Sequence, residues 1–274
     1  MPRGGTGRRL SLLLVCALLL AAGCADLAGE RYERAEKELL ARRMESALEG
    51  FRATAREHPQ SRHAPAALMR QGDIYGAYFR NFPAALEAYD SLVFNYPRAA
   101  EVPPALLRSA EIHLLQYMDG AAAAGNLERI RREFPGFERM DEALFLLAHA
   151  YGAAGEVDRQ TAVLAELVER HPRSNRALEG RWMLAHAFQG QRRYADAERE
   201  FRKLLFLAPD RKTAVRARWG VAQSLEGMGD LPGAIAQYEA LRNDWHDPRY
   251  VAEKLQRLKA RAGAPERGKE RGNR

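Results

Sequence analysis

Histidine is the residue type in this sequence best suited to bind a metal or move a proton, and two of the seven histidines keep a regular spacing. His149 and His186 lie in similar stretches one sequence repeat apart, which predicts equivalent positions on neighbouring helices. Packed helices lie roughly 8–10 Å apart, too far for a shared metal ion unless both side chains converge. No HExxH, GxSxG, P-loop or calcium-loop pattern occurs. We therefore expect no enzyme, no cofactor, no metal site and no small-molecule substrate.

Cys24 is the other residue whose surroundings suggest chemistry. A basic head precedes an apolar run at residues 10–22, which is too short to span a bilayer and is typical of a secretory signal peptide. The run ends in Ala21-Ala22-Gly23-Cys24, which resembles the bacterial lipoprotein cleavage box. This resemblance implies that residues 1–23 are removed and that Cys24 becomes a lipidated first residue. The alternative is an ordinary signal peptide followed by an incidental cysteine.

The cysteine count fits this interpretation. Cys16, the only other cysteine, lies in the segment to be removed, so we expect no disulfide in the mature chain.

Several acyl chains, each stabilised by about 0.8 kcal/mol per buried methylene, hold a protein durably on a membrane. In the sorting rule of such lipoproteins, an aspartate directly after the cysteine retains the protein at the inner membrane. Ala25 stands there instead, which favours the outer membrane.

The net charge of +7 does not indicate a nucleic-acid partner. The excess lies in the leader and in the last residues, whereas residues 24–258 hold 34 basic and 34 acidic side chains. Residues 263–274 are glycine-rich and charged, without apolar anchors, which is typical of disorder. We expect a solvated tail there and no nucleic-acid binding; the alternative is a tail that contacts anionic lipid headgroups or cell-wall polymer.

Two rows of side chains recur at the same spacing along the chain. The bulkier row is Tyr32, Met69, Leu107, Phe145, Trp182 and Trp219, and the polar row four residues later is Glu36, Asp73, Glu111, His149, His186 and Gln223. An apolar row beside a polar row suits a partner peptide or helix lying in a groove, and tryptophan is a frequent binding anchor. Alternatively, the bulkier row is core packed between repeats. The acidic members of the polar row are either a strip for a basic partner or a solvated face.

Prolines set the spacing of the elements that would position these rows. Six of them, Pro59, Pro97, Pro135, Pro172, Pro209 and Pro248, recur every 37 to 39 residues, and a fixed period in this range indicates a helical repeat array. We expect each to stop a helix, because proline disfavours helical geometry in the residue before it. Pro65, Pro83, Pro103-Pro104 and Pro232 are expected near helix starts.

Small and large residues keep the same period. Twelve residues before the first five prolines stand Ala47, Ala85, Ala123, Gln160 and Ala197, and eight before stand Phe51, Tyr89, Leu127, Leu164 and Phe201; Ala234 and Tyr238 continue the two series. A small residue lets two helices cross closely, and the larger residue one turn later fills the space beside it. The pattern predicts six helical hairpins between Glu30 and Pro248, and a covering helix from Arg249 to Ala262.

These residues resemble the tetratricopeptide repeat. Ala148-His149-Ala150-Tyr151, Ala185-His186-Ala187-Phe188 and Gly72-Asp73-Ile74-Tyr75 match the first helix of that repeat, and residues 229–235 match its turn and second helix. The resemblance implies an all-α, right-handed α-solenoid of about six hairpins with a C-terminal capping helix. The predicted domains are the signal peptide at 1–23, a lipidated tether at 24–29, the repeats at 30–262 and the tail at 263–274.

The resemblance also bears on function. The lipid anchor, together with Tyr96-Pro97, Phe134-Pro135 and His171-Pro172 at the unit ends, resembles the barrel-assembly lipoproteins of the BamD type. This implies a scaffold on the periplasmic face of the outer membrane that binds barrel-assembly components or unfolded outer-membrane proteins. Other envelope roles remain open, namely coordination of cell-wall synthesis or division, or of exopolysaccharide export.

The partner-binding residues predicted on this basis come from both rows. They are Tyr32, Met69, Asp73, Glu111, Phe145, His149, Trp182, His186, Trp219 and Gln223. The Lys and Asn side chains with which some tetratricopeptide domains clamp a peptide carboxylate are absent from these positions, which argues against that class of ligand.

Overall fold

The computed structural model describes residues 27–263, and within this range the chain forms helices and no strand. The predicted signal peptide, Cys24 and residues 264–274 of the tail lie outside the described residues. A helix occupies residues 27–40, already helical three residues before the predicted start at Glu30. It is followed by α2 (Met44–Glu57), α3 (Ala64–Ala77), α4 (Phe82–Asn95), α5 (Val102–Leu115), α6 (Gly120–Glu133), α7 (Met140–Ala153), α8 (Val157–Arg170), α9 (Asn175–Gly190), α10 (Tyr194–Leu207), α11 (Arg211–Met228), α12 (Leu231–Ala240) and α13 (Pro248–Ala262).

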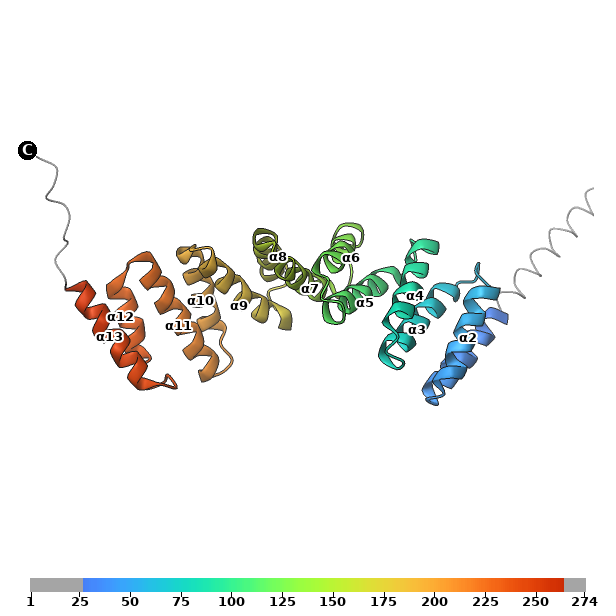
Figure 1. The fold of residues 1–274 in the computed structure, drawn as a ribbon, viewed down its shortest axis with the longest axis horizontal. Coiled ribbons are helices and arrows are strands. Elements are labelled where there is room, and N and C mark those ends of the chain that lie inside the picture. Colours follow the sequence, from blue (N-terminus) through green and yellow to red (C-terminus); the bar gives the residue numbers. More distant parts are fainter. Residues whose placement is uncertain (1–26, 264–274) are drawn as a thin grey trace, which may run out of the picture. The chain divides into compact units, whose positions relative to one another are not determined.

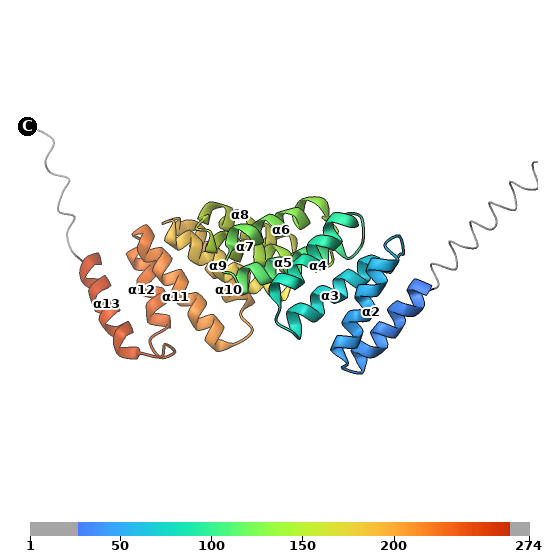
Figure 2. The same cartoon turned by 45° about the vertical axis from the view of Figure 1, so that its right-hand side comes forward.

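The helices pair in sequence order, in two compact units that divide after Met140. In the first unit α3 packs between α2 and α4, and α5 packs between α4 and α6 (Figure 1). In the second unit α9 and α11 are enclosed in the same way, and α13 covers α12 (Figure 2). The predicted all-α fold of six hairpins and a capping helix is confirmed.

The predicted core residues lie where adjacent helices cross. The small residues Ala47, Ala85, Ala123, Ala197 and Ala234 are fully buried, and so are Phe51, Leu127, Leu164, Phe201 and Tyr238, with Tyr89 nearly so. Glycines on the first helices let these rings approach: a Cβ on Gly72 would lie 2.3 Å from the Tyr89 ring, and one on Gly220 would lie 2.5 Å from Phe201. The rings therefore pack directly against glycine backbone, which holds the neighbouring helices in close contact.

In the fourth hairpin, the residue that departs from the repeat pattern, Gln160, also packs against a glycine of the facing helix. Gln160 stands where the other hairpins have alanine, and its side chain is only partly buried. A Cβ on Gly152 would lie 2.5 Å from the Gln160 amide nitrogen. The longer side chain fits because the facing helix has no side chain at this point.

Each hairpin turns through one residue with left-handed backbone geometry. These residues are Arg42, Arg80, Met118, Gly155, Arg192 and Gly229, with φ between 50° and 80°. Side chains other than glycine rarely adopt this geometry, because Cβ crowds the following carbonyl. Four of the six turns therefore carry local strain that the packing of the flanking helices sustains.

Met118→Gly is expected to stabilise the protein by about 0.5–1 kcal/mol, because glycine adopts the left-handed geometry without a Cβ clash. The Met118 side chain is 81% exposed, so little packing is lost with it. The measurement is the urea-unfolding midpoint of the variant against wild type. Met118→Ala, which removes the same side chain but keeps Cβ, should show no such gain; an equal gain would assign the effect to the exposed methionine.

The proline predictions hold with one correction. The first five of the periodic prolines each follow a helix end by two residues, and Pro65, Pro83, Pro103 and Pro232 lie at helix starts. Pro248, predicted to stop the last repeat helix, instead begins α13, since α12 already ends at Ala240. Proline suits that position because the first amide of a helix has no intrahelical acceptor.

A buried ion pair joins the two helices of the fifth hairpin. Arg181 on α9 donates to the carboxylate of Glu200 on α10, and their side chains are only 9% and 10% exposed. Lys203 reaches the same carboxylate at 2.7 Å from the solvent side. The corresponding positions in the other hairpins do not repeat this pair of residue types, so the sequence period gave no sign of it.

Candidate functional site

The polar row of the first unit is an alternating ladder of charges. Arg70 Nε lies 2.7 Å from Glu36 Oε1, and Arg108 Nη1 lies 2.9 Å from Glu111 Oε2. Between these pairs, Asp73 accepts a hydrogen bond of 2.9 Å from the Tyr89 hydroxyl. Burial raises the pKa of Asp73, and the Tyr89 hydrogen bond and the two arginines oppose that rise. Glu36 and Glu111 are thus each compensated by an arginine, and Asp73 lies near both arginines, so the row is not an unopposed acidic strip.

Two of the predicted binding residues nevertheless open onto a cavity. Asp73 and Glu111 line a pocket of about 360 Å³ between α3 and α5, together with Arg108, Phe82 and Leu115. Tyr32 and Met69, the predicted apolar anchors of this unit, are partly buried, and the Tyr32 ring packs 5.3 Å from that of Phe51. In the first unit, this pocket is therefore lined by polar members of the two rows and by none of the bulky members.

The bulky row of the second unit is packed to different depths. Phe145 is 5% exposed and lies against His149, with the Arg176 guanidinium 5.0 Å above its ring. Trp182 is partly buried against Phe201 at 5.8 Å, and Arg216 covers it at 4.9 Å. Phe145 is therefore a core residue in this structure, whereas Trp182 keeps part of its surface open.

Trp219 belongs to an aromatic cluster that was not predicted. It stacks on Trp245 at 4.2 Å with an angle of 14° between the rings, and meets Tyr238 edge-on at 4.9 Å and Tyr250 at 5.7 Å. Trp245 lies in the connection between α12 and α13, where no repeat position identifies it. The polar-row residues His149, His186 and Gln223 are exposed on α7, α9 and α11. On α9 and α11, the surface therefore presents a polar side chain one helical turn after a half-buried tryptophan.

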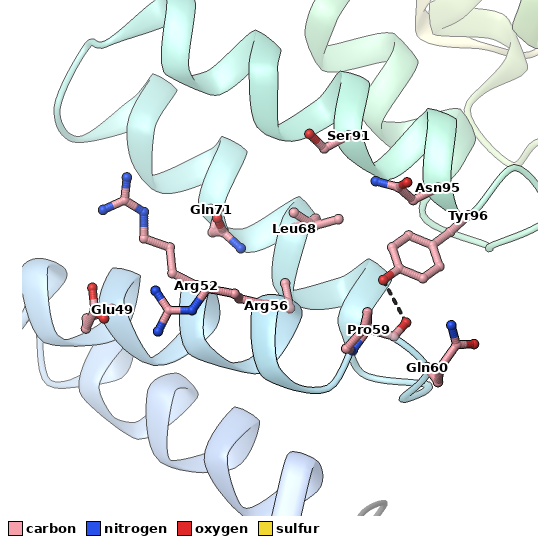
Figure 3. A pocket seen from close by; sticks show the side chains of 11 residues that line it. Glu49, Arg52, Arg56, Pro59, Gln60, Leu68, Gln71, Ser91, Asn95 and Tyr96 are labelled. Carbon is pink, nitrogen blue, oxygen red and sulfur yellow. Dashed lines mark hydrogen bonds between the residues drawn. The ribbon is translucent and has the colours of Figure 1, made fainter.

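A second cavity, of about 710 Å³, lies between α2 and α4 with α3 as its floor (Figure 3). It is lined by Arg52 and Arg56 from α2, by Leu68 and Gln71 from α3, by Ser91 and Asn95 from α4, and by Tyr96 directly after α4. The Tyr96 hydroxyl donates a 2.8 Å hydrogen bond to the Pro59 carbonyl (Figure 3), which ties the ends of α4 and α2 together. Sequence reasoning missed this cavity, since its residues occupy different repeat positions on three helices.

The histidines and carboxylates of residues 27–263 form no cluster of three or more that could hold a metal ion. None of the helices in that range combines the length and the apolar composition needed for a membrane crossing.

Comparison with solved structures identifies similar folds. The chain is similar to a tetratricopeptide repeat protein from Parabacteroides merdae, with 20% identity, a TM-score of 0.54, and coverage of 86% of this chain and 89% of that one. It is also similar to the C-terminal part of a TPR repeat-containing protein from Cytophaga hutchinsonii, at 14% identity, TM-score 0.62, and 83% and 87% coverage. PilF of Pseudomonas aeruginosa matches at 12% identity, TM-score 0.51, and 87% and 99% coverage. No family model matches the sequence, and no curated protein matches it. The chain therefore has the fold of tetratricopeptide-repeat proteins.

Proposed function

We propose that the protein is a lipid-anchored scaffold that holds other envelope proteins at the periplasmic face of the outer membrane, in the assembly of outer-membrane proteins. On this proposal it acts by binding and not by catalysis. The anchor and the location rest on Ala21-Ala22-Gly23-Cys24 and on Ala25, and the assembly role rests on the resemblance of the repeat ends to BamD-type lipoproteins.

One structural observation supports a binding role above the others. His186 and Gln223 occupy the same position on α9 and α11, both are exposed, and each follows a half-buried tryptophan by one helical turn. Equivalent side chains on successive helices present a regular surface to an extended or helical partner. The part of each tryptophan that remains accessible provides apolar contact area beside these polar groups.

Photo-crosslinking in cells tests this role. A photo-reactive amino acid placed at His186 or at Gln223 is expected to capture specific envelope proteins, which mass spectrometry identifies. The matched control is Phe206, which is 89% exposed on the second helix α10, where the proposal expects no enrichment of the same proteins. Barrel-assembly components among the captured proteins would support the finer proposal. Equal capture at all three positions, or none at His186 and Gln223, would contradict the binding surface.

Cys24→Ser is expected to abolish acylation and to block cleavage by the lipoprotein peptidase, because the thiol is the acceptor of the lipid. Labelled palmitate incorporation and membrane fractionation of the variant against wild type measure this. Cys16→Ser, in the segment expected to be removed, is the control and should leave both unchanged. Continued palmitate labelling of Cys24→Ser would show that the anchor lies elsewhere or does not exist.

A further inference from the structure

A third cavity, in the second unit, differs in character from the two described above. It has a volume of about 660 Å³ and lies between the first turns of α11 and the connection from α12 to α13. The lining residues are Arg211, Lys212, Val215 and Arg216 from α11, and Asp244, Trp245 and His246 from the connection. None of them belongs to the rows predicted from the sequence.

Trp245 and Val215 form an apolar wall on this pocket. Trp245 is held by its stacking on Trp219, and Val215 faces the pocket from one turn further along α11. Arg211 forms an ion pair with Asp244, which joins the connection to the first turn of α11. Pockets that are largely preformed and apolar, with a few placed polar groups, are typical of ligand sites.

The charge of the pocket is unbalanced. Asp244 is its one acidic lining residue, and Arg211 already pairs with it. Lys212 lies within electrostatic reach of the Asp210 carboxylate, directly before α11, and Arg216 lies over the Trp182 ring at 4.9 Å. The three cations Arg211, Lys212 and Arg216 thus outnumber the two carboxylates of Asp210 and Asp244 around the apolar wall, which favours a ligand that brings carboxylates together with an apolar group.

We propose that this pocket binds a partner's peptide segment in which an apolar side chain is flanked by acidic residues. The apolar side chain would lie against Trp245 and Val215, and the carboxylates would pair with Lys212 and Arg216. We choose a peptide over a free small molecule because the pocket adjoins two tryptophans of the bulky row. Arg216 contacts Trp182, and Trp245 contacts Trp219. A peptide chain that lies along Trp182 and Trp219 therefore reaches the pocket. The inference rests on the proposed scaffold role and specifies the chemistry of a partner.

The test is fluorescence anisotropy with the folded mature chain and a labelled hexapeptide, blocked at both ends, with leucine and phenylalanine flanked on each side by two acidic residues. Wild type is expected to bind it, and Lys212→Glu and Arg216→Gln each to weaken binding at least tenfold. The control Arg257→Glu changes an exposed arginine on α13 outside the pocket and should leave binding unchanged. Two further peptides, one with amides in place of the acids and one with alanines in place of the apolar pair, should bind at least tenfold more weakly.

Three results would overturn the inference. They are equal binding of the amide peptide, no effect of Lys212→Glu, and absence of peptide binding while phosphatidylglycerol vesicles bind in a Lys212-dependent way, which would indicate a lipid site. Crosslinking at His186 in Lys212→Glu cells separates this outcome from failure of the scaffold role. If the peptide test fails but partner capture at His186 persists, only the pocket inference is wrong; if capture is absent in wild-type cells too, the proposed function itself fails.

Discussion

Ala197→Glu is expected to lower the free energy of unfolding by about 4 kcal/mol or more. Ala197 is fully buried on α10, which packs against both α9 and α11. Inserting a larger side chain into such a contact costs about 1–3 kcal/mol, and burying an unpaired carboxylate adds several more. Because stability in repeat proteins is a sum over neighbouring elements, the loss should be greatest in α9, α10 and α11. Urea unfolding and amide hydrogen exchange of these helices measure it.

The adjacent residue provides the control for this prediction. Glu198, whose side chain is 14% exposed, forms an ion pair on the same helix with Arg202, which is 54% exposed, and pairs that reach the surface in this way contribute about 0–1 kcal/mol. Glu198→Ala should therefore unfold nearly as wild type does. Equal losses for Ala197→Glu and Glu198→Ala would show that the helix α10 does not bury the face assigned to it.

Glu200→Ala is expected to destabilise the second unit by about 3–5 kcal/mol, because it leaves the buried Arg181 guanidinium without its carboxylate. Replacing both partners with apolar residues avoids that unpaired charge. The double variant Arg181→Met with Glu200→Leu should therefore recover most of the loss and unfold close to wild type. Chemical unfolding of wild type, Arg181→Met, Glu200→Leu and the double variant forms a complete cycle that measures the coupling.

Arg202→Ala is the surface control for this cycle, since its side chain is 54% exposed, and it should cost less than about 1 kcal/mol. A double variant as unstable as Glu200→Ala would mean that the pair contributes shape and not charge compensation. If Glu200→Ala unfolds at the same midpoint as wild type, the Arg181 guanidinium does not depend on Glu200 for charge compensation. That result would contradict the buried ion pair seen in the structure.

The sequence by itself determined the hairpins, their number and the residues at their crossings. These features depend on signals that are local or that recur at one spacing: a proline two residues after a helix end, an alanine in the second helix, a large side chain one turn later. Each hairpin must bury the same face against its neighbours, so the same residue types recur every 37 to 39 residues. The prediction that Pro248 stops a helix was wrong, because a proline fits the first turn of a helix as well as the region after a helix end.

Only the tertiary structure decided which side chains are partners and which remain open. The pairing of Glu36 with Arg70, of Arg181 with Glu200 and of Trp219 with Trp245 joins residues 19 to 34 positions apart on different elements. No local rule selects these pairs, because they depend on the register and rotation of packed helices. The same holds for the row that sequence reasoning proposed as a groove: one spacing placed Phe145 and Trp182 at equivalent positions, yet the first is buried and the second half-open. Depth of burial is set by the neighbouring helices, and an individual residue's position in the repeat does not contain that information.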